Sequence, residues 1–229
     1  ERGPHFGTAG NRRLMNRHHP PFRLGVFGAS GYGKTEWVLR WLRKERSVCR
    51  FIFDPENEFA GALRSYNVTN PAQMGEQMRH GWCLYDPAEM FRGNWADGFA
   101  YFAAFAFEAS KHFRGRKIFV CDEAWRYLKT HELPPAVEEL VCTGRRQEID
   151  FVTISQFPNR INGVMRDNLT DVVCFGLVTK NTLQFPTEFG FDPEQLRKLP
   201  RFQYVHRTRG GTEKRSATAG PAPKRKTHP

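Results

Sequence analysis

The chain alternates short apolar runs with longer segments in which apolar residues recur at helical spacing. The short runs end near glycine, proline or charged residues, and they predict strands over 22–28, 50–54, 81–86, 117–123, 151–156 and 171–178. The segments between them predict helices over 35–46, 71–80, 95–113 and 134–148, another starting near Asn159, and short pieces over 182–189 and 193–199. Segment 95–113 is apolar on most faces, so its phenylalanines are expected in the core.

Strands that alternate with helices over this length predict an α/β fold with a mostly parallel central sheet flanked by helices. Ligands bind such sheets at the carboxyl ends of the strands, and the polar motifs of this chain lie at those ends. Residues 22–206 are therefore predicted to form one domain, in which 86–97 is the most insertion-like segment.

The net charge of +11 is concentrated at the two ends of the chain. Residues 1–23 contribute +4 and residues 207–229 contribute +6, which leaves only +1 for the middle. Both ends are rich in glycine, proline and basic residues and lack apolar periodicity, so 1–21 and 207–229 are predicted to be poorly ordered basic arms. Such arms attract phosphate backbones, and a purely solubilising role is the alternative.

Two features of the sequence indicate the cellular compartment of the protein: its cysteines and its most apolar stretch. Five cysteines lie far apart without a C-x-x-C pair, several of them inside apolar runs, and we expect them to be buried and reduced. The most apolar stretch, FAYFAAFAF at 99–107, is far too short to span a bilayer. These patterns predict a protein of cytoplasmic character without an integral membrane segment.

Residues 28–35 read GASGYGKT and fit G-x-x-x-x-G-K-[ST] between a predicted strand and a predicted helix. Glycines let this loop curl so that its amides and the helix N-terminus face the β-phosphate. Lys34 is expected to contact the β- and γ-phosphates, and the Thr35 hydroxyl to bind Mg²⁺. The alternative is a glycine-rich turn that binds nothing. We therefore predict ATP and Mg²⁺ as cofactors, with nucleotide-binding residues Gly28, Ala29, Ser30, Gly31, Tyr32, Gly33, Lys34 and Thr35.

The second half of a hydrolytic site is predicted where the apolar run 118–121 ends in two carboxylates. Asp122 would hold Mg²⁺ through water, and Glu123 would polarise the attacking water as general base. From the residues alone, we expect this strand to lie beside the strand that precedes the P-loop. Glu123 favours hydrolysis over transfer to a metabolite, because a nucleotide kinase does not need to activate water.

Two further sites carry chemistry. Gln156 ends the strand 151–156 and is predicted to contact the γ-phosphate or the lytic water, with an ordinary strand-end glutamine as the alternative. Arg145 and Arg146 present two guanidinium groups of the kind that stabilise a transferring phosphoryl group, often from a neighbouring subunit. The alternative is that they are solvated or bind DNA.

Four segments, taken in order, resemble the FtsK/HerA superfamily of DNA-pumping ATPases. They are the P-loop GASGYGKT, the segment FDPENEF with its Asp-Pro-x-x-Glu-aromatic pattern, the segment VCDEAW, and GRRQEIDFVTISQFP with its Gly-Arg, apolar strand, Ser/Thr-Gln and Pro signature. The resemblance covers roughly residues 22–178 and is far more specific than a P-loop alone. The basic ends match no element of the family.

The resemblance implies a RecA-like fold of the additional-strand, catalytic-Glu class, with an extra strand between the P-loop strand and the strand that ends at Asp122. It further implies a homo-oligomeric ring, a hexamer, around double-stranded DNA. Arg145, or failing it Arg146, would be the trans-acting arginine finger, and Gln156 the sensor. The doubled arginine leaves the finger assignment open, and residues 92–94 and 160–166 are both candidates for gripping DNA.

Within the superfamily, the short chain is most similar to the genome-packaging ATPases of tailless, membrane-containing viruses. This implies an ATPase that drives viral double-stranded DNA into a preformed capsid, with capsid or portal-vertex proteins as partners, in the host cytoplasm or the virion. The alternatives are a morphogenesis or secretion ATPase like that of filamentous phages, a nucleotide-gated DNA-binding module, and a small-molecule kinase.

Overall fold

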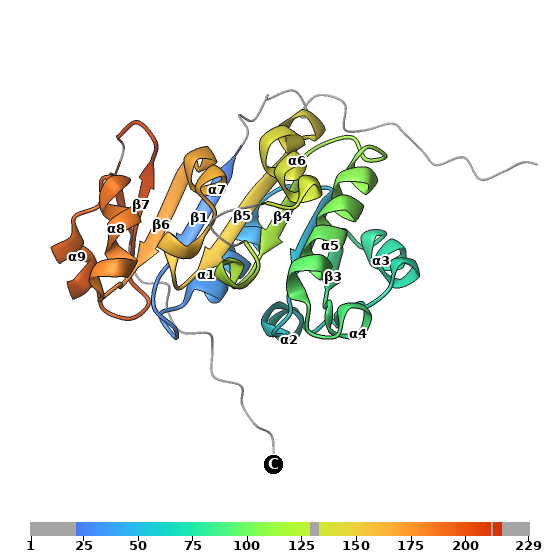
Figure 1. Ribbon diagram of the computed structural model, residues 1–229, viewed down its shortest axis with the longest axis horizontal. Coiled ribbons are helices and arrows are strands. Elements are labelled where there is room, and N and C mark those ends of the chain that lie inside the picture. Colours follow the sequence, from blue (N-terminus) through green and yellow to red (C-terminus); the bar gives the residue numbers. More distant parts are fainter. Residues whose placement is uncertain (1–21, 129–132, 212, 217–229) are drawn as a thin grey trace, which may run out of the picture.

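An eight-stranded sheet forms the centre of the computed structural model, which describes residues 22–128, 133–211 and 213–216 (Figure 1). The arm predicted over 1–21 and residues 217–229 lie outside the described residues. The strands are β1 (Arg23–Phe27), β2 (Cys49–Phe53), β3 (Trp82–Tyr85), β4 (Lys117–Cys121), β5 (Ile149–Ser155), β6 (Asp171–Phe175), β7 (Tyr204–Thr208) and β8 (Glu213–Ser216). Their order in the sheet is β3-β2-β4-β5-β1-β6-β7-β8.

Strands β1 to β6 pair in parallel, so the predicted α/β fold with a mostly parallel sheet is confirmed. One expectation is wrong: β4, which ends at the Asp122-Glu123 pair, does not lie beside β1. Strand β5 pairs with both and separates them. This is the additional-strand arrangement that the family resemblance implies. The order of strands along the chain does not determine their order in the sheet, so periodicity alone could not reveal it.

Helices cover both faces of the sheet. The α-helices are α1 (Lys34–Lys44), α2 (Glu58–Leu63), α3 (Pro71–Met78), α4 (Ala88–Phe91), α5 (Trp95–Ser110), α6 (Pro135–Thr143), α7 (Gly163–Asn168), α8 (Lys180–Glu188) and α9 (Pro193–Lys198). Helices α1 and α2 share one core with the sheet, whereas α5 and α6 belong to the core of the opposite face. In Figure 1, α5, α6 and α7 lie in front of the strands.

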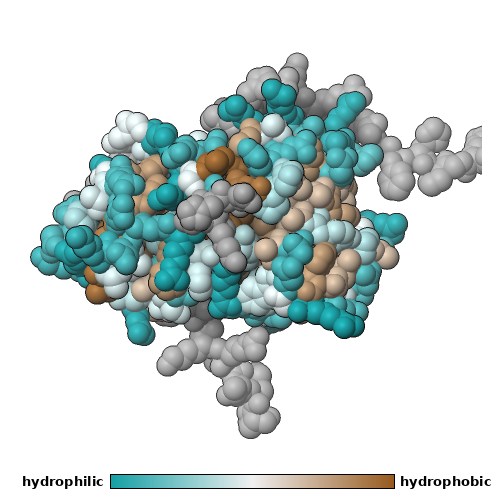
Figure 2. Space-filling view, viewed as in Figure 1, coloured by the Kyte–Doolittle hydropathy of each residue, from teal (hydrophilic) through white to brown (hydrophobic). Residues whose placement is uncertain are grey.

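The phenylalanines of α5 belong to the core, as predicted. Phe99 and Phe102 are fully buried, and the Phe99 ring lies edge-on to Phe53 of β2 at 5.1 Å between centroids. Between the exposed Asp97 and Glu108, the outer side of the helix carries alanines and the half-buried Phe105. Figure 2 shows this as a tan area over α5, in contrast to the hydrophilic surface over α8 and α9.

The predicted domain boundary at residue 207 differs from the structure. Strand β7 runs across it, and β8 pairs with β7 in an antiparallel hairpin at the edge of the sheet. The predicted poorly ordered tail therefore contains ordered backbone as far as Ser216. Among the residues of β7 only Val205 is buried. Its backbone pairs with β6 and β8 without an apolar pattern, so the sequence of β7 resembles that of a polar tail.

Other local differences are small. The helix predicted over 134–148 ends at Thr143 and continues as the 3-10 turn η2 (Gly144–Gln147). The helix expected near Asn159 is the 3-10 turn η3 (Pro158–Arg160), with α7 following it, and the insertion-like segment 86–97 contains α4. All five cysteines are free, and only Cys142 is not fully buried. Among the described residues, no helix combines the length and the apolar character that a membrane span requires.

Candidate active site

The P-loop connects β1 to α1 and is fixed at both neighbouring strands. The Gly28 amide donates to the carbonyl of Ser155 at 3.4 Å, and the Ala29 amide donates to that of Gly176 at 2.9 Å. A side chain at Gly28 would place its Cβ 2.5 Å from Cβ of Phe175, so only glycine fits there. The backbone of the loop is therefore held by the carboxyl ends of β5 and β6.

The loop leads directly into the first turn of α1. Gly33 takes a positive φ of 97° as the residue before the helix, a conformation that favours glycine. The free amides of this turn and the helix dipole form a site for anions. Lys34 is buried, and its Nζ donates to the Ala29 carbonyl at 3.2 Å. Burial lowers the pKa of Lys34, against the opposing effect of nearby carboxylates, first among them Glu123.

Carboxylates that follow two of the strands gather at the same end of the sheet as the P-loop. Asp122 follows β4, is 4% exposed, and accepts a 2.9 Å hydrogen bond at Oδ1 from the Glu123 amide. Burial raises the pKa of Asp122 well above its ordinary value, and Glu58, Glu123 and Asp54 raise it further. Asp54 follows β2 and is fully buried; its Oδ1 has no hydrogen-bond partner. A cation bound beside these carboxylates would favour their charged forms.

A magnesium ion fits this site in the form of a nucleotide complex. Within the described ranges, no group of three or more His, Cys, Asp or Glu side chains is arranged to hold a metal by itself. Mg²⁺ usually takes only one or two protein ligands and completes its shell with phosphates and water. The Thr35 hydroxyl and the Asp122 carboxylate suit that role, so the residues fit Mg²⁺ bound with ATP.

Thr35 has a partner that the sequence reasoning did not assign. Its hydroxyl donates to Oε2 of Glu58 at 2.8 Å. Glu58 is the first residue of α2 and belongs to FDPENEF, one of the segments that resemble the FtsK/HerA superfamily. The sequence predicted no role for it. Its contact with the hydroxyl that is predicted to bind Mg²⁺ makes it a candidate residue of the site.

The structure brings Glu123 and Gln156 together. The Gln156 amide donates to Oε1 of Glu123 at 3.2 Å, and the indole N–H of Trp125 donates to Oε2. Glu123 itself has a positive φ of 47°, which is uncommon for a residue other than glycine. Such strain persists where the surroundings enforce it, often at functional sites. Trp125 lies in the turn η1 (Ala124–Arg126) and ends the VCDEAW segment, but the sequence predicted no role for it.

Arg145 and Arg146 lie away from this group. They are exposed in η2, which precedes β5, whereas Gln156 follows that strand. Because β5 runs parallel to β1, its start lies at the edge of the sheet opposite the P-loop. Seven residues of strand at about 3.3 Å each span roughly 20 Å. Neither arginine can contact a phosphate in the P-loop of its own subunit.

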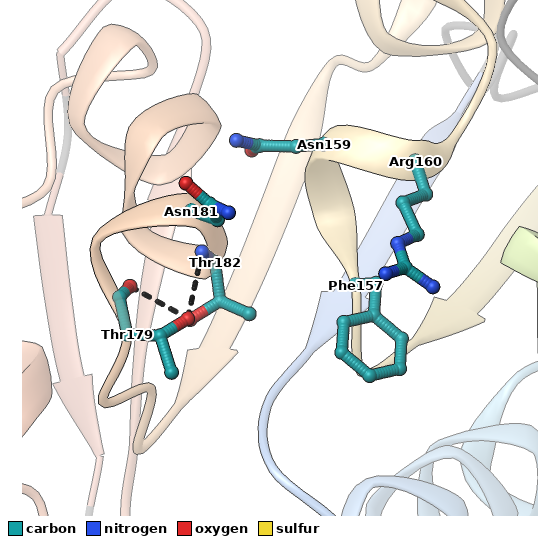
Figure 3. Close-up of a pocket in the computed structure, with 6 residues that line it drawn as sticks. All are labelled: Phe157, Asn159, Arg160, Thr179, Asn181 and Thr182. Atoms are coloured by element: carbon teal, nitrogen blue, oxygen red, sulfur yellow. Dashed lines mark hydrogen bonds between the residues drawn. The ribbon is translucent and has the colours of Figure 1, made fainter.

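A shallow pocket of about 130 Å³ opens between η3 and the start of α8. Figure 3 shows Thr179, Asn181 and Thr182 on one side of it, and Asn159, Arg160 and Phe157 on the other. The hydroxyl of Thr182 donates to the Thr179 carbonyl at 2.9 Å. The guanidinium of Arg160 lies over the Phe157 ring, 4.6 Å from its centroid.

The sequence matches no protein-family model and no curated protein, but solved structures share its fold. The genome packaging NTPase B204 of Sulfolobus turreted icosahedral virus 2, in complex with AMPPCP, aligns with a TM-score of 0.69 and 17% identity over 86% of this chain and 97% of that chain. VirB4 of Thermoanaerobacter pseudethanolicus aligns with a TM-score of 0.58 and 11% identity, covering 87% and 89%.

ATPases 2 and 3 of EssC from Geobacillus thermodenitrificans align with a TM-score of 0.53 and 14% identity, over 82% of this chain and 37% of that chain. At these identities the likeness concerns the fold. The resemblance that the motifs predicted is confirmed at that level: the chain has the fold of the FtsK/HerA-type P-loop ATPases.

Proposed function

We propose that the protein is an ATP-hydrolysing DNA translocase that packages a viral double-stranded DNA genome into a preformed capsid. ATP hydrolysis is supported by one observation above all, the contact of Gln156 with Glu123. Glu123 follows Asp122 at the same end of the sheet as the P-loop. The fold shared with a viral genome packaging NTPase supports the packaging part.

In the proposed reaction, the P-loop amides, the start of α1 and Lys34 hold the β- and γ-phosphates. Thr35, and Asp122 through water, would hold Mg²⁺, which would supply positive charge to the phosphates. Glu123 accepts a proton from the attacking water, and Gln156 orients that water while it contacts the same carboxylate. Gly28, Ala29, Ser30, Gly31, Tyr32 and Gly33 form the remainder of the nucleotide site.

The proposed assembly is a hexameric ring around duplex DNA. Because Arg145 and Arg146 are exposed at the sheet edge opposite the P-loop, an arginine finger from this pair acts on the nucleotide of a neighbouring subunit. Capsid or portal-vertex proteins are the proposed further partners. The place of action is the host cytoplasm or the packaging vertex of the virion.

ATP turnover with and without double-stranded DNA tests this function, with the native mass measured on the same sample. We expect multiple turnovers, a severalfold higher rate with DNA and a six-subunit mass. A nucleotide-gated DNA-binding module would release at most one phosphate per site. An ATP turnover rate that is the same with and without DNA would show that the protein is not a translocase.

A further inference from the structure

Three aromatic rings and two guanidinium groups alternate at the surface beside the catalytic carboxylates. Arg126 lies over Trp95 at 4.9 Å and over Trp125 at 5.5 Å from the ring centroids. Arg160 lies over Trp125 at 5.5 Å and over Phe157 at 4.6 Å. The rings of Trp125 and Phe157 meet edge to face at 5.0 Å. We call these five residues the arginine–aromatic stack, and Trp125 lies at its centre.

The stack is hydrogen-bonded to the general base of the proposed reaction. The Trp125 indole N–H occupies Oε2 of Glu123, while Gln156 occupies Oε1. These two donors take up acceptor positions on the carboxylate oxygens that a hydrogen bond from the attacking water would need. The position of one indole ring therefore bears directly on the ability of Glu123 to accept a proton.

The two arginines differ in their other contacts. Arg126 forms an ion pair with Glu56 at 2.7 Å and is about one-third exposed. Arg160 is exposed, and no carboxylate in the described part of the chain pairs with it. A guanidinium held over aromatic rings without a counter-charge is suited to binding a phosphate, because Arg donates in a fixed fork to phosphate oxygens. Figure 3 shows it at the rim of the pocket, pointing away from α8.

We propose that the arginine–aromatic stack binds the phosphate backbone of duplex DNA and that Trp125 transmits this binding to Glu123. This inference rests on the proposed function and specifies how DNA controls it. A phosphate that takes Arg160 removes one of the two cations packed on the Trp125 ring. The ring then shifts, its N–H leaves Oε2, and Glu123 is free to act as general base. Trp125 is accordingly a positioning residue, and Arg160 is the DNA contact.

The Trp125→Phe variant separates the hydrogen bond from the packing, because phenylalanine keeps an aromatic ring but has no N–H. We expect its turnover without DNA to rise severalfold towards the DNA-stimulated rate of the wild type, with little further rise on adding DNA. A wild-type rate without DNA together with full stimulation would overturn the role of Trp125. Thermal unfolding of the variant shows that the comparison is made on folded protein.

The Arg160→Gln variant tests the DNA contact and does not depend on the fate of Trp125. We expect several-fold weaker binding of a fluorescent duplex and a shift of the stimulation curve to higher DNA concentration. Arg79→Gln is the control, because Arg79 is exposed at the end of α3 and its guanidinium pairs with Glu76. Equal losses in both variants, or none in Arg160→Gln, would overturn the assignment, as would stimulation by heparin equal to that by DNA.

The outcomes for the inference and for the proposed function are distinct. If the wild type is indifferent to DNA but Trp125→Phe turns over faster, the restraint on Glu123 stands and the translocase function fails. If the wild type is stimulated and Trp125→Phe is stimulated by the same factor from the same basal rate, the function stands and the inference fails.

Discussion

The Thr35 hydroxyl donates to Oε2 of Glu58 at 2.8 Å. Thr35 is the second residue of α1, and Glu58 is the first residue of α2, so the contact joins two elements across the carboxyl edge of the sheet. The same hydroxyl is the expected protein ligand of Mg²⁺. If Mg²⁺ bound with ATP took Thr35 as a ligand, the Glu58 carboxylate would supply a negative charge near it.

We expect Glu58→Gln to raise the Mg²⁺ concentration needed for half-maximal ATP turnover severalfold, because glutamine keeps a hydrogen-bond acceptor for Thr35 but removes a negative charge near the metal. A Mg²⁺ titration at saturating ATP measures this. Glu89→Gln makes the same change of charge at an exposed position of α4 and should not shift the curve. A wild-type curve for Glu58→Gln would show that this carboxylate does not help attract the metal.

The Glu123→Gln variant should bind ATP normally and hydrolyse it very slowly. Glutamine has a similar shape but cannot accept a proton, and general-base catalysis contributes about 10²–10⁴-fold. Binding of a fluorescent ATP analogue and phosphate release, measured together, separate the two effects. Lys34→Ala, which removes the cation at the phosphates, should lose binding itself. Wild-type turnover in Glu123→Gln would refute the assignment of the base.

The buried Asp122 makes stability depend on pH in the absence of nucleotide. Because burial holds its folded pKa well above the ordinary 3.8, the stability it contributes is present at acidic pH and lost as pH rises through the folded value. Asp122→Asn removes this loss. Its melting temperature should exceed that of the wild type by an amount that grows from acidic to neutral pH, and each kcal/mol corresponds to about 2–4 °C. A difference that does not change with pH would contradict this account.

The arginine finger can be assigned by mixing subunits. A ring with Arg145→Ala subunits keeps its general bases, and Glu123→Gln subunits keep their fingers, so a mixture restores complete sites at some interfaces. We expect one of the two arginine variants, Arg145→Ala or Arg146→Ala, to recover turnover when it is mixed with Glu123→Gln. That arginine variant alone and Glu123→Gln alone should show no turnover. Failure of both mixtures to recover would argue against a finger in trans.

The core between α5 and the sheet should tolerate little loss of volume. Phe102 is fully buried and packs on Tyr85 and Phe119 at 5.0 and 5.4 Å between ring centroids. Phe102→Ala should lower the free energy of unfolding by about 3–5 kcal/mol, as denaturant titration would show. Phe105→Ala, on the same helix but half-buried, should cost clearly less. Equal losses would mean that this face of α5 is not closely packed.

The sequence predicted the parts of the site that depend on local spacing. A P-loop needs its glycines, Lys34 and Thr35 at fixed positions, and a carboxylate pair directly after a buried run can only lie at the end of a strand. Glu58 and Trp125 were not predicted as site residues, because their contacts with Thr35 and Glu123 depend on where loops from different strands meet. The order of the strands, which periodicity does not determine, decides those contacts.

The hairpin of β7 and β8 at the edge of the sheet was not predicted, for a different reason. Strand β7 has one buried residue, Val205, among five, and pairing with β6 through the backbone needs no apolar pattern. The types and spacing of the side chains were enough to predict Lys34, Asp122 and the P-loop glycines as site residues. This hairpin can be recognised only from the backbone hydrogen bonds that it forms.

The most direct test of the central claim is movement along DNA. A duplex carrying a third strand releases that strand when a motor passes, and its release is measured by the loss of a fluorescent label from the triplex. We predict release by the wild type with ATP and Mg²⁺, and none by Glu123→Gln or with a non-hydrolysable analogue. ATP turnover by the wild type without release of the third strand would contradict the account.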